Sequence, residues 1–275
     1  MNSMENTDKT SNLIGLVDVH VHSTFSHDGV DDPQTLYQQA KDLGLGGICL
    51  TEHGDYKPQL EHAGYFSYDH FNSTLQEIKN ARSDDTPLLL RGLEFSEPHI
   101  YPREFSRLNQ LDLDMVTGAV HWIEGIFIGK DRLLDKLSEV EFYNRYYDKV
   151  MAMVEFGGFD VLSHLHFPAR YHGSGSYIQE KLTNILQLII EKDIVLEINT
   201  AVTEKNTSGY YLPEKEVLKL YKQLGGKKVV LGSDAHTREE IAQSFPRVRK
   251  LIAELKLTAG YFAQREFQKL YLEEE

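Results

Sequence analysis

A short apolar run that ends in a histidine, glutamate or aspartate recurs along the whole chain. These runs cover residues 16–22, 47–53, 88–95, 115–122, 161–164, 194–199 and 228–233. Their length and composition predict β-strands, whereas the amphipathic stretches between them predict helices. Strands that alternate with helices over 275 residues indicate an α/β fold with a mostly parallel sheet.

The amphipathic stretches carry helix signals of their own. Asp32 and Pro33 mark the start of the first helix, as N-cap and first-turn residue, and Gly44 marks its end. Further helices are predicted over residues 71–82, 133–156, 177–192, 213–224 and 238–255, with a charged helix near residues 262–272. The chain shows no linker and no low-complexity tract, which predicts one folded domain.

The first apolar run carries the most specific pattern. From Val17 to His22 apolar and polar side chains alternate, and the run ends in His-x-His. Side chains two apart on a strand point to the same face, so His20 and His22 can bind one cation together. Asp28 follows in the next loop, directly before Gly29. This segment therefore predicts a metal site at the carboxyl end of the first strand.

The other runs end in residues of the same kind. The polar side chains at or just after their ends are His53, Glu94, His121, His164, Asn199, Asp234 and His236. In a barrel of parallel strands the carboxyl ends open onto one face, so these groups would meet at one mouth. This concentration favours a closed or nearly closed barrel over an open sheet. Imidazoles together with carboxylates suit Zn²⁺, Fe²⁺ or Mn²⁺.

Each of these residues also has an ordinary structural explanation. His121 and His164 could be hydrogen-bonded core histidines. Glu94 could be a charge at a helix N-terminus, and Asp234 could be an N-cap. Such explanations must be made separately for every strand end, whereas one metal site accounts for all of them. Burying so many ionisable groups at one face is costly unless cations compensate them, so we prefer the metal site.

Composition narrows the classes of partner. The formal net charge is −13, which argues against long nucleic acid, because a phosphate backbone is bound by a cationic surface. The single cysteine, Cys49, lies in an apolar run and predicts a buried thiol and a reducing compartment. Residues 1–12 are polar and predict a disordered tail, not a signal peptide. No apolar run approaches the ~20 residues that span a membrane, and we expect a cytoplasmic protein.

The order of these motifs resembles one known family. His-x-His with a downstream Asp-Gly, Thr-Glu-His, Gly-Leu-Glu, Gly-x-Val-His, Ser-His and Gly-Ser-Asp-Ala-His resemble the successive motifs of the polymerase-and-histidinol-phosphatase (PHP) metallophosphoesterases. The resemblance covers residues 17–255. It implies a distorted (β/α)₇ TIM-like barrel, as a single domain over residues 13–275, with the metal site at the C-terminal ends of the strands.

The resemblance also implies three divalent ions, Zn²⁺, Fe²⁺ or Mn²⁺, and assigns their ligands. The first ion would be bound by His20, His22, Glu94 and Asp234. The second would be bound by Asp28, His53 and His236. The third would be bound by Glu94, His121 and His164, so that one carboxylate bridges two ions. Such a cluster would carry surplus positive charge and attract a phosphate dianion even in an acidic protein.

For function, the resemblance implies a metal-dependent phosphomonoesterase, and within the family a histidinol-phosphate phosphatase of histidine biosynthesis. Two or more metal ions favour phosphoryl transfer because they activate water and offset charge on the phosphate and leaving oxygens. One alternative is a phosphoesterase for another small phosphate ester or for a nucleotide or oligonucleotide. Others are a non-catalytic metal-binding regulatory module, and a binuclear (β/α)₈ amidohydrolase, although no metal-bridging lysine ends a strand.

Loops near the later strands supply candidate contacts for the substrate. Arg170 lies where the histidinol-phosphatase branch carries a phosphate-binding arginine, and a guanidinium can bind two phosphate oxygens at once. His166 is a candidate proton donor. Glu204 replaces the branch's second basic residue and leaves Lys205 as the substitute. The other predicted substrate contacts are His53, His99 and Asn199. Two of the metal ligands are also predicted to be catalytic, namely Asp234 and His236.

Overall fold

The computed structural model describes residues 13–56, 61, 63–82, 87–130, 137–172, 179–201 and 211–271. The tail predicted over residues 1–12 lies outside this described part.

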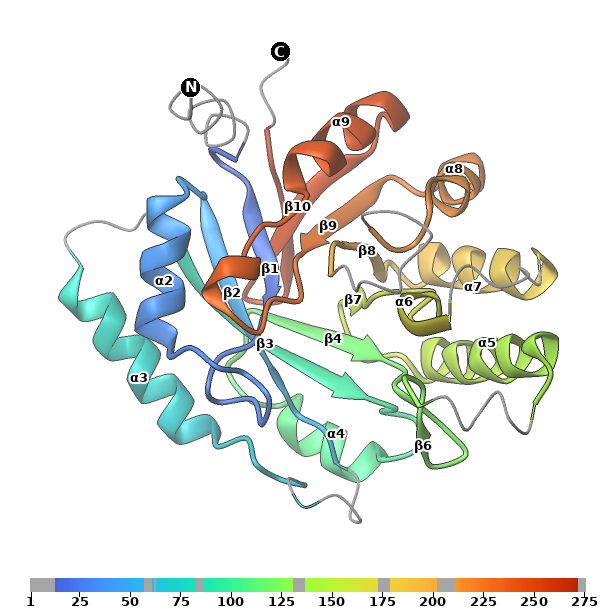
Figure 1. Cartoon of the computed structure of the whole chain (residues 1–275), viewed down its shortest axis with the longest axis horizontal. Coiled ribbons are helices and arrows are strands. Elements are labelled where there is room, and N and C mark those ends of the chain that lie inside the picture. Colours follow the sequence, from blue (N-terminus) through green and yellow to red (C-terminus); the bar gives the residue numbers. More distant parts are fainter. Residues whose placement is uncertain are drawn as a thin grey trace.

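One nine-stranded sheet forms the centre of the molecule (Figure 1). Its strands, in spatial order, are β1 (Val17–Val21), β2 (Gly47–His53), β3 (Leu88–Ser96), β4 (Met115–Ala119), β7 (Val161–Leu162), β8 (Val195–Asn199), β9 (Lys228–Gly232), β10 (Thr258–Ala263) and β11 (Glu266–Lys269). Neighbouring strands from β1 to β10 pair in parallel, and β11 turns back antiparallel to β10. All seven predicted strands are present, and the α/β class with a mostly parallel sheet is confirmed.

The helices lie around the outside of the sheet (Figure 1). They are α2 (Pro33–Asp42), α3 (Tyr68–Ala81), α4 (Pro102–Leu108), α5 (Glu139–Phe156), α6 (Ala169–His172), α7 (Gln179–Glu191), α8 (Lys215–Gln223) and α9 (Phe245–Leu255), with a 3₁₀ turn η2 (Arg238–Glu240). A small hairpin of β5 (Trp122–Ile123) and β6 (Ile126–Phe127) follows β4. None of the helices in the described ranges is long and apolar enough to cross a lipid bilayer.

Local signals in the sequence set most helix boundaries. Asp32 caps α2 as predicted, because its Oδ1 accepts the main-chain N–H groups of Gln34 at 2.9 Å and Thr35 at 3.1 Å. The helix predicted over residues 238–255 is divided into η2 and α9. Between the two, Ala242 and Ser244 adopt left-handed backbone angles (φ 55° and 62°), which an α-helix cannot contain.

Main-chain contacts bring β1 and β9 together. The amide of Asp234, just after β9, donates to the carbonyl of His20 at 2.7 Å, and the amide of His22 donates to the carbonyl of Ala235 at 2.8 Å. The buried carboxylate of Asp18 on β1 accepts the amides of Ser233 and Ala242, both at 2.9 Å. β1 and β9 are thus neighbours although β2, β3, β4, β7 and β8 lie between them in the sheet order, in keeping with a nearly closed barrel whose strand ends share one mouth.

The strands also enclose an apolar interior. This cluster consists of Val17, Val19, Cys49, Leu90, Met115, Val161, Val195, Val230 and Phe262. Cys49 is buried, as the sequence predicts, and burial raises the pKa of its thiol above the ordinary range. A larger core between the sheet and the surrounding helices extends from Leu13 to Ala259. Successive side chains on a strand face the two cores in turn, which explains why each strand is apolar along most of its length.

The predicted C-terminal helix is wrong, because residues 258–269 form the hairpin of β10 and β11. Phe262 enters the interior cluster, and Phe267 packs against that cluster from the second strand. The two strands are joined by Gln264 and Arg265, whose φ angles of 51° and 65° give the left-handed two-residue turn that suits a hairpin. Neither residue is the glycine or asparagine that normally announces such a turn in a sequence.

Arg265 connects this hairpin to loops across the sheet. Its guanidinium contacts the carboxylate of Asp160, donates to Asn109 Oδ1 at 2.8 Å and donates to the carbonyl of Gly158 at 3.2 Å. We expect Arg265→Ala to lower the free energy of unfolding by about 1–2 kcal/mol, because the largely buried carboxylate of Asp160 loses its cation. Urea unfolding followed by circular dichroism measures this change. Lys219→Ala, which breaks an exposed pair with Glu216, should cost much less, and an equal loss would contradict the prediction.

Candidate metal centre

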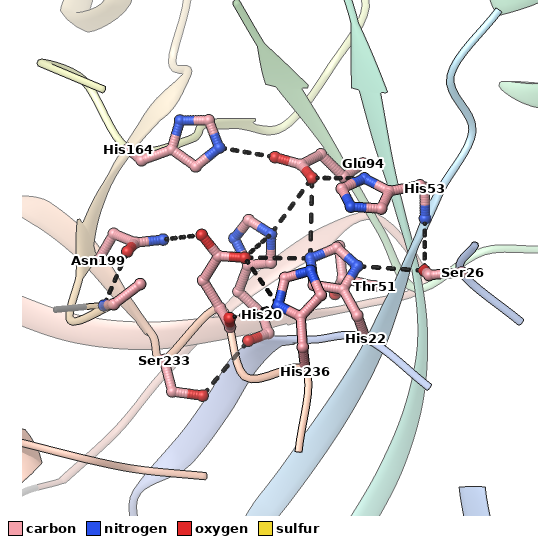
Figure 2. Close-up of polar contacts among 12 residues, drawn as sticks. His20, His22, Ser26, Thr51, His53, Glu94, His164, Asn199, Ser233 and His236 are labelled. Atoms are coloured by element: carbon pink, nitrogen blue, oxygen red, sulfur yellow. Dashed lines mark hydrogen bonds and ion pairs between the residues drawn. The ribbon is translucent and has the colours of Figure 1, made fainter. Parts of the chain in front are cut away.

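The predicted metal ligands come from the carboxyl ends of the parallel strands. His20, His53 and Glu94 lie on β1, β2 and β3. The other imidazoles and carboxylates follow β1, β4, β7 and β9, namely His22, Asp28, His121, His164, Asp234 and His236. The carboxylate of Glu94 lies in the middle of the set, and Figure 2 shows the imidazoles of His20, His22, His53 and His164 gathered around it.

The first group joins both histidines of the His-x-His motif to two carboxylates. Glu94 Oε2 lies 3.6 Å from His20 Nε2 and 3.8 Å from His22 Nε2. Asp234 Oδ1 lies 3.7 Å from His20 Nε2 and 3.2 Å from His22 Nε2. The four side chains predicted to share one ion therefore point at a common space.

Two further groups flank the first. Glu94 Oε1 lies 2.8 Å from His164 Nε2 and 3.6 Å from His121 Nε2, and the two imidazole nitrogens are 3.2 Å apart. On the other side, the two oxygens of Asp28 lie 3.4 Å from His53 Nε2 and 3.4 Å from His236 Nε2. His53 Nδ1 is in turn 3.0 Å from Glu94 Oε2. Glu94 thus contacts residues of all three groups.

Unsatisfied nitrogens support a metal site at this position. His20 Nε2 and His22 Nε2 are buried and have no hydrogen-bond partner among the described residues. Their distances of 3.2–3.8 Å from the carboxylate oxygens suit ligands on one ion, because bonds of about 2.0–2.1 Å in a tetrahedron separate ligand atoms by about 3.3 Å. The outer nitrogen of each ring is occupied: His20 Nδ1 lies 2.6 Å from Glu197 Oε1, and His22 Nδ1 lies 3.2 Å from Ser26 Oγ.

A cavity of about 380 Å³ opens beside these groups. Predicted ligand side chains from all three groups line one side of it, including His53, Glu94 and Asp234. The residues on the other side are aromatic or charged, namely Asp55, Trp122, Phe127, Lys130, Phe167, Arg170 and Tyr171. The cavity therefore combines a potential metal surface with an apolar wall large enough for a small organic ligand.

Arg170 is held at the boundary between the two sides. Its Nη2 donates to Asp234 Oδ2 at 2.7 Å and to Asn199 Oδ1 at 2.9 Å, and its guanidinium lies 4.9 Å from the centre of the Phe167 ring. Asp234 thus presents one oxygen to His20 and His22 and the other to Arg170. Asn199 contacts Arg170 from behind and is not among the residues that line the cavity.

Comparison with known proteins places the chain in a family. A family model for the PHP domain matches residues 18–201. The chain belongs to the PHP family.

Relatives of this PHP protein carry one recurring name. A histidinol-phosphatase of Lactococcus lactis is 30% identical over 256 residues, which cover 86% of this chain and 90% of the relative. A protein of Thermotoga maritima named "Probable histidinol-phosphatase" is 28% identical over 241 residues, again 86% of this chain and 90% of the relative. The solved structure of the Lactococcus lactis histidinol phosphate phosphatase, complexed with zinc, L-histidinol and phosphate, matches with a TM-score of 0.76 at 28% identity. The match covers 93% of this chain and 100% of that chain.

Opposing effects act on the buried groups of this PHP site. Burial alone would lower the pKa of His20, but the charges of Glu197, Glu94 and Asp234 outweigh it and raise that pKa well above its ordinary value. Burial alone would raise the pKa of Glu94, but the charges of His20 and His121 hold it well below its usual range. Negative charge in this cluster therefore attracts either protons or a cation, and a metal ion that binds His20 must displace a proton.

The structure does not bring His166 into the cavity. The side chain is fully buried on the far side of its loop, where Nδ1 lies 2.5 Å from Glu214 Oε2 and Nε2 contacts the hydroxyl of Tyr147. The expected role of His166 as proton donor stays a prediction, and its position outside the cavity lining gives that role no support. His164 and His166 resemble the His-x-His of β1 in sequence, but β7 ends at Leu162 and both histidines have positive φ angles (24° and 80°), so their side chains diverge.

The other predicted substrate contacts divide into two kinds. His53 lines the cavity, whereas His99 does not. Burial and the nearby charge of Lys149 lower the pKa of His99 to about 4. Lys205 lies outside the described residues, as does Glu204.

Glu197 has a position that the sequence analysis did not predict. It is fully buried in the middle of β8, where Oε1 faces His20 Nδ1 and Oε2 accepts the main-chain N–H of His164 at 2.6 Å. Gly232 opposite must be glycine, because a Cβ there would lie 2.1 Å from Glu197 Oε1. The signal was available in the sequence: Glu197 precedes Asn199 by two residues on a strand and so shares its face.

Glu94 offers a direct test of the shared centre. Glu94→Gln keeps the shape of the side chain but removes the negative charge that three groups share. We expect this variant to bind divalent metal at least about 10-fold more weakly and to retain fewer ions after dialysis. Elemental analysis of the dialysed protein measures the content. Glu180→Gln, at an exposed position of α7, is the matched control, and unchanged metal content in Glu94→Gln would contradict the shared role.

Proposed function

We propose that this protein is a metal-dependent phosphomonoesterase that hydrolyses L-histidinol phosphate to L-histidinol and phosphate in histidine biosynthesis. The observation that carries the proposal is the position of Arg170 beside Asp234, in a cavity lined by imidazole and carboxylate groups. The similar Lactococcus lactis phosphatase, complexed with zinc, L-histidinol and phosphate, supports the choice of substrate.

We assign three divalent ions to the centre, which are Zn²⁺, Fe²⁺ or Mn²⁺. The proposed ligand sets are His20, His22, Glu94 and Asp234 for the first ion, Asp28, His53 and His236 for the second, and Glu94, His121 and His164 for the third. The three clusters of ligand atoms support this number, and the zinc in the Lactococcus lactis structure supports zinc as one of the metals. Divalent ions bound there would lower the pKa of water towards ~7 and offset the negative charge of a phosphate ester.

Arg170 would orient the phosphate group. A guanidinium carries five N–H donors in a planar fork, so one nitrogen can hold Asp234 while another contacts a phosphate oxygen. The contacts with Asp234 and Asn199 restrict the rotamers of Arg170 before any substrate binds. Less conformational entropy is then lost when the ester enters, which favours a productive orientation.

The aromatic wall would take the organic part of the ester. Trp122 and Phe127 come from the β5–β6 hairpin, and Phe167 and Tyr171 come from the loop and short helix after β7. These rings shield one side of the cavity from water and offer flat surfaces to a planar imidazole.

We also propose that residues 13–275 form a single domain and that the protein acts in the cytoplasm. The larger apolar core, which continues from Leu13 to Ala259, supports a single domain. The single buried cysteine and the reaction proposed above support a reducing, biosynthetic compartment.

The substrate proposal is tested by the initial rate of phosphate release. L-histidinol phosphate is compared with sugar phosphates, nucleotides and bis-p-nitrophenyl phosphate, and the metal content of the same sample is determined. We expect L-histidinol phosphate to give the highest kcat/KM. Faster cleavage of the diester or of a nucleotide would indicate another phosphoesterase, and bound metal without turnover of any ester would indicate a non-catalytic module.

The role of Arg170 is tested by substitution. We expect Arg170→Ala to lower kcat/KM for L-histidinol phosphate by about 100-fold or more, because a charged donor to the phosphate and a contact with Asp234 are both lost. Arg107→Ala, at an exposed position of α4, removes the same charge from a residue that does not line the cavity and should leave the kinetics unchanged. Wild-type kinetics in the Arg170 variant would remove this residue from the mechanism.

A further inference from the structure

Two serine hydroxyls each lie between a predicted metal ligand and a carboxylate. The first is Ser26, whose Oγ donates to Glu52 Oε2 at 2.5 Å and lies 3.2 Å from His22 Nδ1. The main-chain N–H of His53 also donates to this hydroxyl at 3.0 Å (Figure 2). Ser26, Glu52 and His22 are all buried, so water does not compete for these contacts.

The second serine repeats the arrangement on the other side of the centre. Ser96 Oγ donates to Asp55 Oδ1 at 2.5 Å and lies 2.7 Å from His121 Nδ1. The main-chain N–H of Ser96 donates to the same carboxylate oxygen at 3.2 Å. The Asp55 carboxylate is 4.0 Å from His121 Nδ1, so the hydroxyl is what connects the two groups.

The direction of these hydrogen bonds follows from the donors available. A hydroxyl has one proton and two lone pairs, and an ionised carboxylate only accepts. The proton of Ser26 therefore goes to Glu52, and one lone pair receives the N–H of His53. The remaining lone pair can only accept, so His22 Nδ1 must carry the ring proton. The same reasoning places a proton on His121 Nδ1.

We propose that Ser26 and Ser96 are positioning residues that fix His22 and His121 in the tautomer that presents Nε2 to a metal ion. Each serine donates its proton to a carboxylate, Glu52 or Asp55, and so leaves only a lone pair for the imidazole beside it. A partner on the outer nitrogen of a ligand histidine sets both the tautomer and the orientation of the ring. The inference rests on the metal centre of the proposed function but does not depend on the identity of the substrate.

Two other histidines have an acceptor for a proton on Nδ1 that is not a serine hydroxyl. His20 Nδ1 lies 2.6 Å from Glu197 Oε1, and His236 Nδ1 lies 2.9 Å from the main-chain carbonyl of Asp234. Both oxygens are acceptors, so both rings carry the proton on Nδ1 and turn Nε2 toward the proposed ions. The serines therefore give His22 and His121 the arrangement that His20 and His236 already have.

The first test uses the wild-type protein without metal. Histidine ¹⁵N chemical shifts distinguish the two tautomers, with His22→Gln and His121→Gln samples used to assign the signals. We expect both residues to be protonated at Nδ1 above neutral pH. Signals from the Nε2–H tautomer at either position would overturn the proposal for that position.

The second test measures zinc affinity by competition with a chelator. We expect Ser26→Ala and Ser96→Ala each to weaken binding of at least one ion by about 10–100-fold. Ser163→Ala is the matched control, because Ser163 is buried beside His164 and its Oγ has no hydrogen-bond partner in the described part of the chain. Ser96→Thr keeps the hydroxyl and should restore most of the affinity lost in Ser96→Ala.

The outcomes separate the two proposals. If the wild-type protein binds no zinc, the metal centre itself fails. If the wild-type protein binds zinc and both alanine variants bind it equally well, the positioning role of the two serines fails. If Ser163→Ala loses as much zinc affinity as the other two variants, the losses reflect general packing and the positioning role fails as well. Circular dichroism melts of all variants identify any that do not fold, and for those the ¹⁵N tautomers of the wild-type protein decide.

Discussion

The buried carboxylate of Glu94 imposes the constraint on which the rest of the site depends. It is 1% exposed and has imidazole nitrogens of His20, His22, His53, His121 and His164 within 3.8 Å. A negative charge removed from water in this way is stable only if positive charge is brought to it. Protons on the surrounding imidazoles can supply that charge, but several rings at such distances repel one another when protonated. Divalent cations supply it while the imidazoles stay neutral and act as ligands, so the cluster suits a metal site.

The fold makes this concentration of charge possible by closing β1 against β9. Asp234 reaches the centre only because the segment after β9 is hydrogen-bonded to the main chain of His20 and Ala235 pairs with Val21. The same closure gives the Asp234 carboxylate two contacts, since one oxygen faces the histidines and the other accepts a hydrogen bond from Arg170. The proposed metal ligands and the position of Arg170 are therefore coupled through one side chain.

The sequence predicts the strands and the ligand cluster because both follow from periodicity. Residues two apart on a strand share a face, and parallel strands share an end, so His20 and Glu94 could be placed together without coordinates. Periodicity fails where the backbone leaves the strand. His166 diverges from His164 because the chain turns there, and the hairpin at Arg265 uses left-handed residues that no glycine announces. The contacts of Ser26 depend on exact distances between elements, which no pattern in one sequence specifies.

A crystal structure of the metal-loaded protein, with anomalous diffraction recorded on both sides of the zinc absorption edge, tests the central claim most directly. The account predicts three anomalous peaks: one between the His-x-His pair and Asp234, one between His121 and His164, and one between His53 and His236. Glu94 should lie within bonding distance of the first two. A single peak, or peaks away from Glu94, would contradict the shared centre and the mechanism built on it.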